Sequence, residues 1–315
     1  MTTTSRRRLF ALRPVTALAA AALALATGGK AAIADPAAPA LERRSVSAAE
    51  ADAAEDYWTP ARMEAAIPAE TLLAENDHIA SSEPAAGART MRPRAAAASP
   101  AVTPVDHIGK VFFTIDGTDY VCSANAVVSD NESTVATAGH CAHEGGGSWA
   151  TNWVFVPAYE NGNAPYGAWT AEDLFAPTQW TSEGDMTYDT AFAVVRGEGS
   201  ATLTDTVGGS GVEFNGARGQ RYTSYGYPAG TPFDGETLHQ CTGTAEADPT
   251  GSTESHGIPC DMTGGSSGGP WFLGDGADGV QNSVNSFGYR GLDGVMFGPY
   301  WGAVIEDTYQ EAQGS

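Results

Sequence analysis

Gly265-Ser266-Ser267-Gly268-Gly269-Pro270 is the densest chemical signal in this 315-residue sequence. A serine flanked by glycines can sit on a tight turn with its hydroxyl exposed, because glycine tolerates backbone conformations that other residues avoid. The neighbouring backbone amides are then able to face a bound molecule. Ser267 is therefore a candidate nucleophile, and its chemistry depends on which base and which acid the chain offers.

The order of residues along the chain narrows the choice of catalytic architecture. The motif also satisfies G-x-S-x-G, the nucleophile turn of α/β-hydrolases, but their order is serine, acid, histidine. Here that order is impossible, since every histidine precedes Ser267; they are His78, His107, His140, His143, His239 and His256. The subtilisin order, acid before histidine, belongs to an α/β sheet that this strand-rich chain does not suggest. The order histidine, aspartate, serine remains.

The candidate base is His140 in Thr137-Ala138-Gly139-His140-Cys141. This histidine stands between a β-rich run and a cysteine, so a strand and a disulfide would both hold the imidazole in place. His143 and His107 lack such a frame, and we expect them to have structural roles.

The candidate acid is Asp189, which precedes the apolar run from Thr190 to Val195. A carboxylate at the start of a buried strand is well placed to accept a hydrogen bond from an imidazole N–H. Asp185, in a turn-like Gly184-Asp185 pair, is the less favoured alternative.

Around these motifs, short β-rich runs alternate with turns rich in Gly, Asn and Asp, which is typical of an all-β barrel or sandwich. Near the C-terminus, apolar residues recur at intervals of three and four from Trp301 to Tyr309, so we expect a closing helix there. The predicted strands are Val111–Ile115, Tyr120–Val128, Trp153–Pro157, Ala191–Val195, Arg221–Tyr227, Trp271–Leu273 and Val284–Tyr289.

The N-terminus has the pattern of an export signal. Three arginines, Arg6 to Arg8, precede an apolar run of 12 residues from Val15 to Ala26, whereas a membrane-spanning helix needs about 20. Small residues at Ala32-Ile33-Ala34 predict cleavage before Asp35. The signal peptide is therefore predicted to span 1–34, with either general secretion or the twin-arginine route possible, and the mature protein is expected to be extracellular and free of the membrane.

Residues 35–100 have the composition of a pro-region and linker. They are rich in Ala, Glu and Pro with few aromatic residues, so they cannot bury much apolar surface alone, and a disordered spacer is the alternative. Trp58-Thr59-Pro60 predicts a helix that begins with Thr59 as N-cap. We expect removal of the pro-region between Arg89 and Val105, with Arg92 and Arg94 as candidate sites.

The charge and the cysteines both belong to residues 100–315. The whole formal net charge of −22 lies there, which argues against nucleic-acid binding because such a surface repels phosphates.

Four cysteines in an exported protein can form disulfides in three pairings, and we favour Cys122–Cys141 and Cys241–Cys260 because each joins segments close in sequence. The C-x-x-C spacing of zinc sites is absent. Two Asp-Gly pairs in 274–279 predict hairpin turns more readily than a calcium loop.

Together, T-A-G-H-C, Y-D-T-A-F-A-V-V and G-S-S-G-G-P resemble the chymotrypsin/trypsin family over about residues 105–308. Finer matches resemble its bacterial V8-like, glutamyl-endopeptidase-like branch: Phe155-Val156-Pro157, Pro165-Tyr166-Gly167, Gly226-Tyr227-Pro228 and Cys260-Asp261-Met262. The resemblance implies an all-β fold of two six-stranded antiparallel barrels with a short C-terminal helix, here over 101–315.

The resemblance also implies a serine endopeptidase that forms an acyl-enzyme. Ser267 would attack the peptide carbonyl, His140 would carry the proton, and Asp189 would orient the imidazole. The backbone N–H groups of Gly265 and Ser267 would form the oxyanion hole. Protein or peptide substrates are expected, with no metal or organic cofactor, for a monomeric enzyme.

Two positions depart from the family pattern. Residue 266 is serine where the family usually has Asp or Asn, so the neutral hydroxyl of Ser266 cannot pair with a new N-terminal ammonium during activation. The strand lining the primary pocket has Asn285-Ser286-Phe287-Gly288 where glutamyl-specific members have a histidine, so glutamate specificity is not expected.

Asp261 lies six residues before Ser267, the spacing at which trypsin-like relatives carry the acid that selects Lys or Arg. The alternative is that Asp261 makes only local hydrogen bonds beside Cys260. Two other functions remain possible: a catalytically inactive protein that binds ligands on a protease fold, and an esterase that uses the same three residues.

Overall fold

Strands dominate the computed structural model, which describes residues 41–74, 99–197 and 199–315. The predicted signal peptide and the candidate cleavage sites Arg89, Arg92 and Arg94 lie outside the described residues. Among the residues within these ranges, no helix is both long and apolar enough to cross a membrane.

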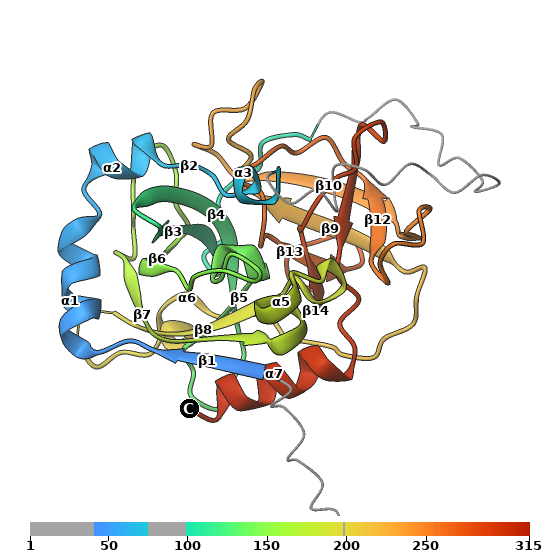
Figure 1. The fold of residues 1–315 in the computed structure, drawn as a ribbon. Coiled ribbons are helices and arrows are strands. Elements are labelled where there is room, and N and C mark those ends of the chain that lie inside the picture. The colour runs from blue at the N-terminus through green and yellow to red at the C-terminus, as the bar shows by residue number, and fades with distance from the viewer. Residues whose placement is uncertain (1–40, 75–98, 198) are drawn as a thin grey trace, which may run out of the picture. The chain divides into compact units, whose positions relative to one another are not determined.

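Six antiparallel strands between residues 108 and 196 close into a barrel, in the order β7-β6-β3-β4-β5-β8, with β8 pairing back onto β7 (Figure 1). Alternate residues of a strand point to opposite faces. In β3, Val111 and Phe113 therefore join the barrel core, while Ile108 and Phe112 pack against a second cluster outside it. The strands are β3 (Ile108–Ile115), β4 (Thr118–Val127), β5 (Thr134–Thr137), β6 (Thr151–Pro157), β7 (Trp169–Pro177) and β8 (Ala191–Arg196).

The second half is built from two sheets rather than one continuous ladder. An isolated bridge between Phe287 and Phe297 links them, because the chain leaving β14 runs on to pair beside β15. The predicted strand Val284–Tyr289 is thus mostly an irregular continuation of β14. One sheet has the order β10-β9-β13-β14, from β9 (Arg221–Gly226), β10 (His239–Thr244), β13 (Pro270–Leu273) and β14 (Gln281–Val284); the other has β11 (Glu246–Ala247), β12 (His256–Pro259) and β15 (Val295–Gly298).

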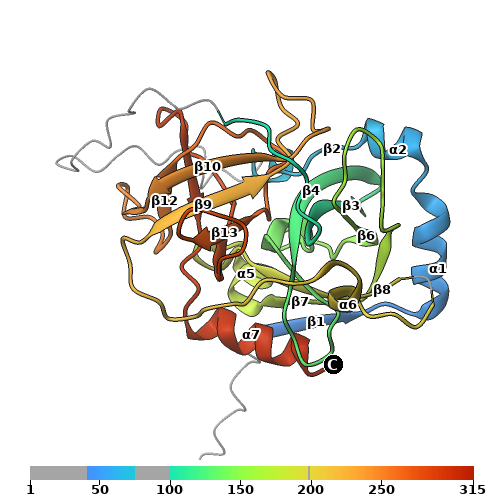
Figure 2. The same cartoon turned by 180° about the vertical axis from the view of Figure 1, so that it is seen from behind.

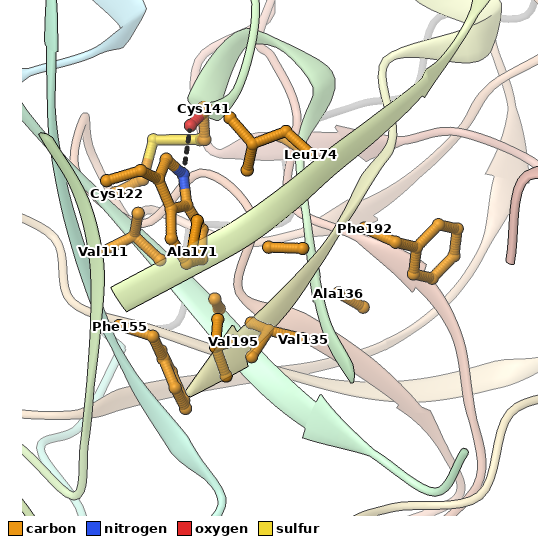
Figure 3. Close-up of a cluster of buried hydrophobic side chains, with 14 of the residues drawn as sticks. Val111, Cys122, Val135, Ala136, Cys141, Phe155, Ala171, Leu174, Phe192 and Val195 are labelled. Atoms are coloured by element: carbon orange, nitrogen blue, oxygen red, sulfur yellow. Dashed lines mark hydrogen bonds between the residues drawn. A yellow bond between two sulfur atoms is a disulfide. The ribbon is translucent and has the colours of Figure 1, made fainter. Parts of the chain in front are cut away.

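The barrel core packs around the Cys122–Cys141 disulfide, which joins β4 to the turn that carries His140 (Figure 3). The indole of Trp153 donates a 2.9 Å hydrogen bond to the carbonyl of Cys141 within this core. Buried aliphatic and aromatic side chains and a covalent link therefore fix the backbone next to His140.

The predicted C-terminal helix is confirmed as α7 (Ala303–Gln313), which lies below β1 (Leu41–Ser45) and β7 in Figure 1. Its buried face includes Ile305 and Tyr309, and the ring of Tyr309 meets Phe192 of β8 at 5.5 Å between centroids. Two further short helices are α5 (Thr178–Glu183), which follows β7, and α6 (Leu203–Val207).

Residues 41–74 pack on the barrel rather than forming a separate unit (Figure 2). Strand β1 pairs with the end of β7, and Arg43 there makes two 2.8 Å hydrogen bonds to Asp173. Trp58 is buried against Phe112 of β3. The predicted cap is confirmed, since Thr59 accepts a hydrogen bond from the N–H of Arg62. The elements are β1 (Leu41–Ser45), α1 (Ala48–Tyr57), α2 (Pro60–Ala65), β2 (Ile67–Pro68) and α3 (Glu70–Ala74).

Candidate active site

The loop that carries Ser267 lies between β12 and β13, and its glycines are required by close contacts. Gly265 and Gly268 have φ values of 93° and 79°, which side chains rarely adopt. A Cβ atom at residue 268 would lie 2.1 Å from the hydroxyl of Thr137, and one at residue 265 would lie 2.8 Å from the carbonyl of Tyr227. The loop therefore packs closely against both halves of the fold, without space for side chains at these two glycines.

His140 and Asp189 meet through two hydrogen bonds. His140 lies in a single turn, Gly139–Cys141, and its Nδ1 is 2.8 Å from Asp189 Oδ2. The backbone N–H of His140 donates to Asp189 Oδ1, also at 2.8 Å. Both side chains are completely buried. This double contact fixes the ring orientation and leaves Nε2 as the nitrogen available for chemistry.

The hydroxyl of Ser286 donates a third hydrogen bond to this carboxylate, at 2.5 Å from Asp189 Oδ2. The predicted pocket residue Ser286 therefore contacts the acid directly. Its carbonyl oxygen also lies 3.4 Å from Ser267 Oγ. Phe287 is buried beside Trp180 in one apolar cluster, so the 286–288 segment connects the acid to an apolar surface.

Charges around His140 favour its protonated form. Burial lowers the pKa of His140, but the charge and hydrogen bond of Asp189 and the charge of Glu70 outweigh it, so the pKa lies above its ordinary value. His143 behaves differently, because burial lowers its pKa to about 4 and its Nδ1 accepts from the N–H of Gly145. Its neutral ring, packed on Trp149, has the structural role that we expected.

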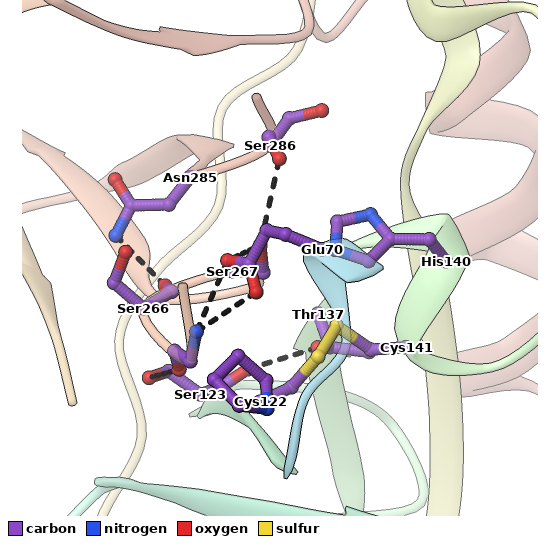
Figure 4. The surroundings of a disulfide bond; sticks show 12 residues. Glu70, Cys122, Ser123, Thr137, His140, Cys141, Ser266, Ser267, Asn285 and Ser286 are labelled. Carbon is purple, nitrogen blue, oxygen red and sulfur yellow. Dashed lines mark hydrogen bonds between the residues drawn. A yellow bond between two sulfur atoms is a disulfide. The ribbon is translucent and has the colours of Figure 1, made fainter. Parts of the chain in front are cut away.

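Sequence reasoning missed two residues that hold the Ser267 loop (Figure 4). Ser123, next to Cys122, donates its hydroxyl to the carbonyl of Gly265 at 2.9 Å, while its N–H donates to the carbonyl of Ser267 at 2.7 Å. Asn285 donates to the carbonyl of Ser266 at 2.9 Å. Neither residue stands in a recognisable motif, although both adjoin positions that do.

Sequence reasoning also missed Glu70, which reaches the loop from the N-terminal segment. Its two carboxylate oxygens lie 3.1 and 2.9 Å from the N–H of Gly265, and Ser267 Oγ donates to it at 2.5 Å. Nε2 of His140 has no hydrogen-bond partner among the residues that the structure describes. In this chain, Ser267 is thus paired with Glu70 and not with His140.

The residues before Ser267 also make hydrogen bonds within the fold. The hydroxyl of Ser266 donates to the carbonyl of Thr263 at 2.8 Å. Asp261 Oδ1 accepts from both the backbone N–H, at 2.8 Å, and the hydroxyl of Ser99. The predicted Cys241–Cys260 pairing is present and holds the strand end next to Asp261.

Among described residues, the one cluster with metal-ligand types is Cys122, His140 and Cys141. Both cysteines are consumed by the disulfide, so this cluster does not offer a thiolate to a metal.

Comparison with protein-family models and with curated proteins gave no match. Solved structures do match. The protease Anisep from Arthrobacter nicotinovorans is 59% identical, with a TM-score of 0.67, and the match covers 68% of this chain and 99% of that one. A thermostable serine protease, AL20, from an extremophilic microorganism is 54% identical, with a TM-score of 0.65 and coverages of 69% and 100%.

A Glu endopeptidase is 18% identical, with a TM-score of 0.54, and covers 69% of this chain and 96% of its own; at that identity it supports the fold alone. The family assignment rests on the two matches of higher sequence identity. This chain belongs to the serine proteases of the chymotrypsin/trypsin-like fold, enzymes that hydrolyse protein and peptide substrates.

Proposed function

We propose that this chain is the precursor of a secreted serine endopeptidase whose catalytic triad is His140, Asp189 and Ser267. The proposal rests on the two hydrogen bonds between His140 and Asp189, whose side chains are completely buried next to the glycine-rich loop that carries Ser267. A structural histidine needs no second bond from its own backbone to the same carboxylate. The arrangement instead suits an imidazole that must gain and lose a proton without turning.

In the proposed reaction, Ser267 Oγ bonds to the carbonyl carbon while its proton passes to His140 Nε2. The carbonyl oxygen becomes an oxyanion beside the N–H groups of Gly265 and Ser267, where a lost donor typically lowers turnover about 10² to 10³ fold. His140 then gives the proton to the leaving amine, and water releases the acyl group by the same steps in reverse. Asp189 stabilises the imidazolium, which its effect on the pKa of His140 supports.

The proposed primary pocket lies beside residues 286–288, with Asp261 at its base. Phe287 belongs to a buried apolar cluster, and Gly288 next to it is exposed and carries no side chain of its own that would compete for the space. The hydrogen bonds from Ser99 to Asp261 argue against a free carboxylate that selects Lys or Arg.

The proposed organisation is a signal peptide over 1–34, a pro-region and linker over 35–100, and a peptidase domain over 101–315. The two closer solved relatives are matched over nearly their whole length yet cover only about two thirds of this chain, so about one third of it has no counterpart in them. Two disulfides suit an extracellular enzyme. We propose a monomer that is free of the membrane once the signal is removed.

The test is peptide hydrolysis by the enzyme after removal of the pro-region. Ser267→Ala should abolish hydrolysis while secretion and thermal unfolding stay unchanged, because a hydroxyl lost from the loop leaves no core cavity. Ser266→Ala is the matched control and should keep most activity. If Ser267→Ala retained wild-type turnover on both peptides and esters, the proposal would be wrong.

A further inference from the structure

The carboxylate of Glu70 lies where the proposed mechanism places the oxyanion (Figure 4). Both of its oxygens accept from the N–H of Gly265, at 2.9 and 3.1 Å, and one also accepts from Ser267 Oγ at 2.5 Å. An oxyanion hole is a set of donors aimed at a negatively charged oxygen. A carboxylate oxygen offers those donors the charge that a substrate carbonyl acquires only during reaction.

This contact also prevents the first chemical step. The hydroxyl proton of Ser267 is directed to Glu70, while His140 Nε2 has no hydrogen-bond partner within the described parts of the chain. The group next to Ser267 Oγ is a carboxylate, which is a poor electrophile, and not a peptide carbonyl. Glu70 therefore engages the nucleophile in a hydrogen bond but presents no bond that the nucleophile could cleave.

The residues before Glu70 are fixed to the first barrel. Ile67 and Pro68 form β2, which pairs in parallel with Tyr120 and Val121 of β4. The next residue, Ala69, is fully buried, and its N–H donates to the carbonyl of Val121 at 3.2 Å.

The residues after Glu70 cover the other side of the nucleophile. Leu73 is only 5% exposed and belongs to the apolar cluster of Trp180 and Phe287. With this segment in place, His140 is 0% exposed and Ser267 1% exposed, although both must meet a peptide from solution. The segment 67–73, which we call the cleft segment, thus fills the site on both sides of Ser267.

The cleft segment runs opposite to the expected substrate. With the proposed pocket at Phe287 and Gly288, substrate residues N-terminal to the cleaved bond lie on that side, and those C-terminal to it lie toward β4. The cleft segment instead has its N-terminal residues Ile67 and Pro68 at β4, while its later residue Leu73 belongs to the apolar cluster that includes Phe287.

We propose, resting on the function proposed above, that Glu70 is a built-in inhibitor: its carboxylate accepts the Gly265 N–H of the proposed oxyanion hole and the hydroxyl of Ser267, while the cleft segment occupies the substrate site in reverse. The precursor is latent because its own chain supplies a carboxylate-bearing peptide to the nucleophile. The site accordingly binds a reversed peptide with a carboxylate side chain at its centre.

The experiment compares intact precursors that carry Glu70→Ala, Glu70→Gln or Glu64→Gln with the wild-type precursor. Glu64 is exposed on α2, just before the cleft segment, and serves as the matched control. Each precursor is mixed with a fluorophosphonate, which reacts when Ser267 Oγ bonds to phosphorus and fluoride leaves. The labelling rate is read by mass spectrometry on the uncleaved chain only.

Both Glu70 variants should label roughly 10 to 100 times faster than the wild type, the range expected for losing one charge-assisted hydrogen-bond partner. Glu64→Gln should label at the wild-type rate. Equal rates for wild type, Glu70→Ala and Glu70→Gln would overturn the inference. The inference would also be overturned if Leu73→Ala raised the labelling rate and the Glu70 variants did not. Ser267 would then be protected by steric cover from Leu73 and not by the carboxylate of Glu70.

A second arm separates this inference from the proposed function. Each precursor is digested with an added arginine-specific protease to remove the pro-region, and labelling is repeated. If the digested wild type labels and hydrolyses peptide while intact Glu70 variants stay slow, only the inhibitor role is wrong. If the digested wild type does neither, the proposed function itself fails.

Discussion

The backbone N–H of Ser99 lies 2.8 Å from Asp261 Oδ1, and the hydroxyl of Ser99 donates to the same oxygen. Ser99 is buried, and the residues after it pair with β10 through a bridge between Ala101 and His239. Ser99 is therefore packed against the proposed peptidase domain through Asp261. A chain cut before Ser99 would present an α-ammonium to the carboxylate of Asp261.

The first prediction concerns this terminus. A mature chain that begins at Ser99 should be more stable than one that begins at Val102, because its ammonium pairs with Asp261. Asp261→Asn in the Ser99 chain should cost about 1.5 to 3 kcal/mol of unfolding free energy, measured with denaturant. Asp275→Asn, at an exposed ion pair with Arg221, is the matched control and should cost much less.

The competing role of Asp261 is to select a basic substrate residue. In a peptide library, Asp261→Asn would then lose cleavage after Lys and Arg selectively. We expect all substrates to be affected alike, and a selective loss would show that Asp261 acts as the pocket acid.

A second prediction concerns the imidazole of His140 in the precursor. The charge of Glu70 contributes to raising its pKa, so removing that charge disfavours the imidazolium, and Glu70→Gln should lower the pKa. Titration of the histidine resonances by NMR, in a Ser267→Ala background that prevents self-cleavage, measures the change. An unchanged or higher pKa would mean that Glu70 does not face the ring in solution.

A third prediction concerns the backbone of the nucleophile loop. Gly268→Ala should prevent folding or cost several kcal/mol, since its Cβ would lie 2.1 Å from Thr137 Oγ1 and 2.3 Å from the carbonyl of Ser123. Gly276→Ala is the control, because a Cβ there meets nothing within 4 Å. Comparable thermal unfolding temperatures for the two variants would contradict this account of the loop.

A fourth prediction concerns Asn285, which is fully buried and whose side chain makes four hydrogen bonds that join the Ser267 loop to β9 and β13. Its Oδ1 accepts from Trp271 at 2.7 Å and from Ser224 at 2.6 Å, and its amide donates to two carbonyls. Asn285→Ala leaves these partners unpaired and should cost at least about 3 kcal/mol. Asn282→Ala, at a buried residue whose Oδ1 lacks a partner among the described residues, should cost less in the same denaturation experiment.

The sequence predicted elements whose apolar pattern is local and unbroken. It missed β7, because Glu172 and Asp173 interrupt its apolar residues and a register shift between Ala171 and Asp173 breaks the alternation. It missed β12 and β15, which are four residues long and carry too few positions for a pattern.

The residues of the candidate site likewise fall into those that the sequence predicts and those that it does not. Ser267, His140 and Asp189 stand in motifs that can be read locally. Glu70 does not, because it is one of eleven acidic residues in the first 99 and meets Ser267 across 197 positions of sequence. Only tertiary structure brings such residues together.

Trapping the acyl-enzyme shows which residue is the nucleophile. The enzyme freed of its pro-region is mixed with an activated peptide ester, quenched in acid, and mapped by fragment mass spectrometry. We predict one acyl group on Ser267 and no accumulation when His140 is replaced by alanine. An acyl group on Ser266 or on any other residue, or undiminished acylation without His140, would contradict the assignment.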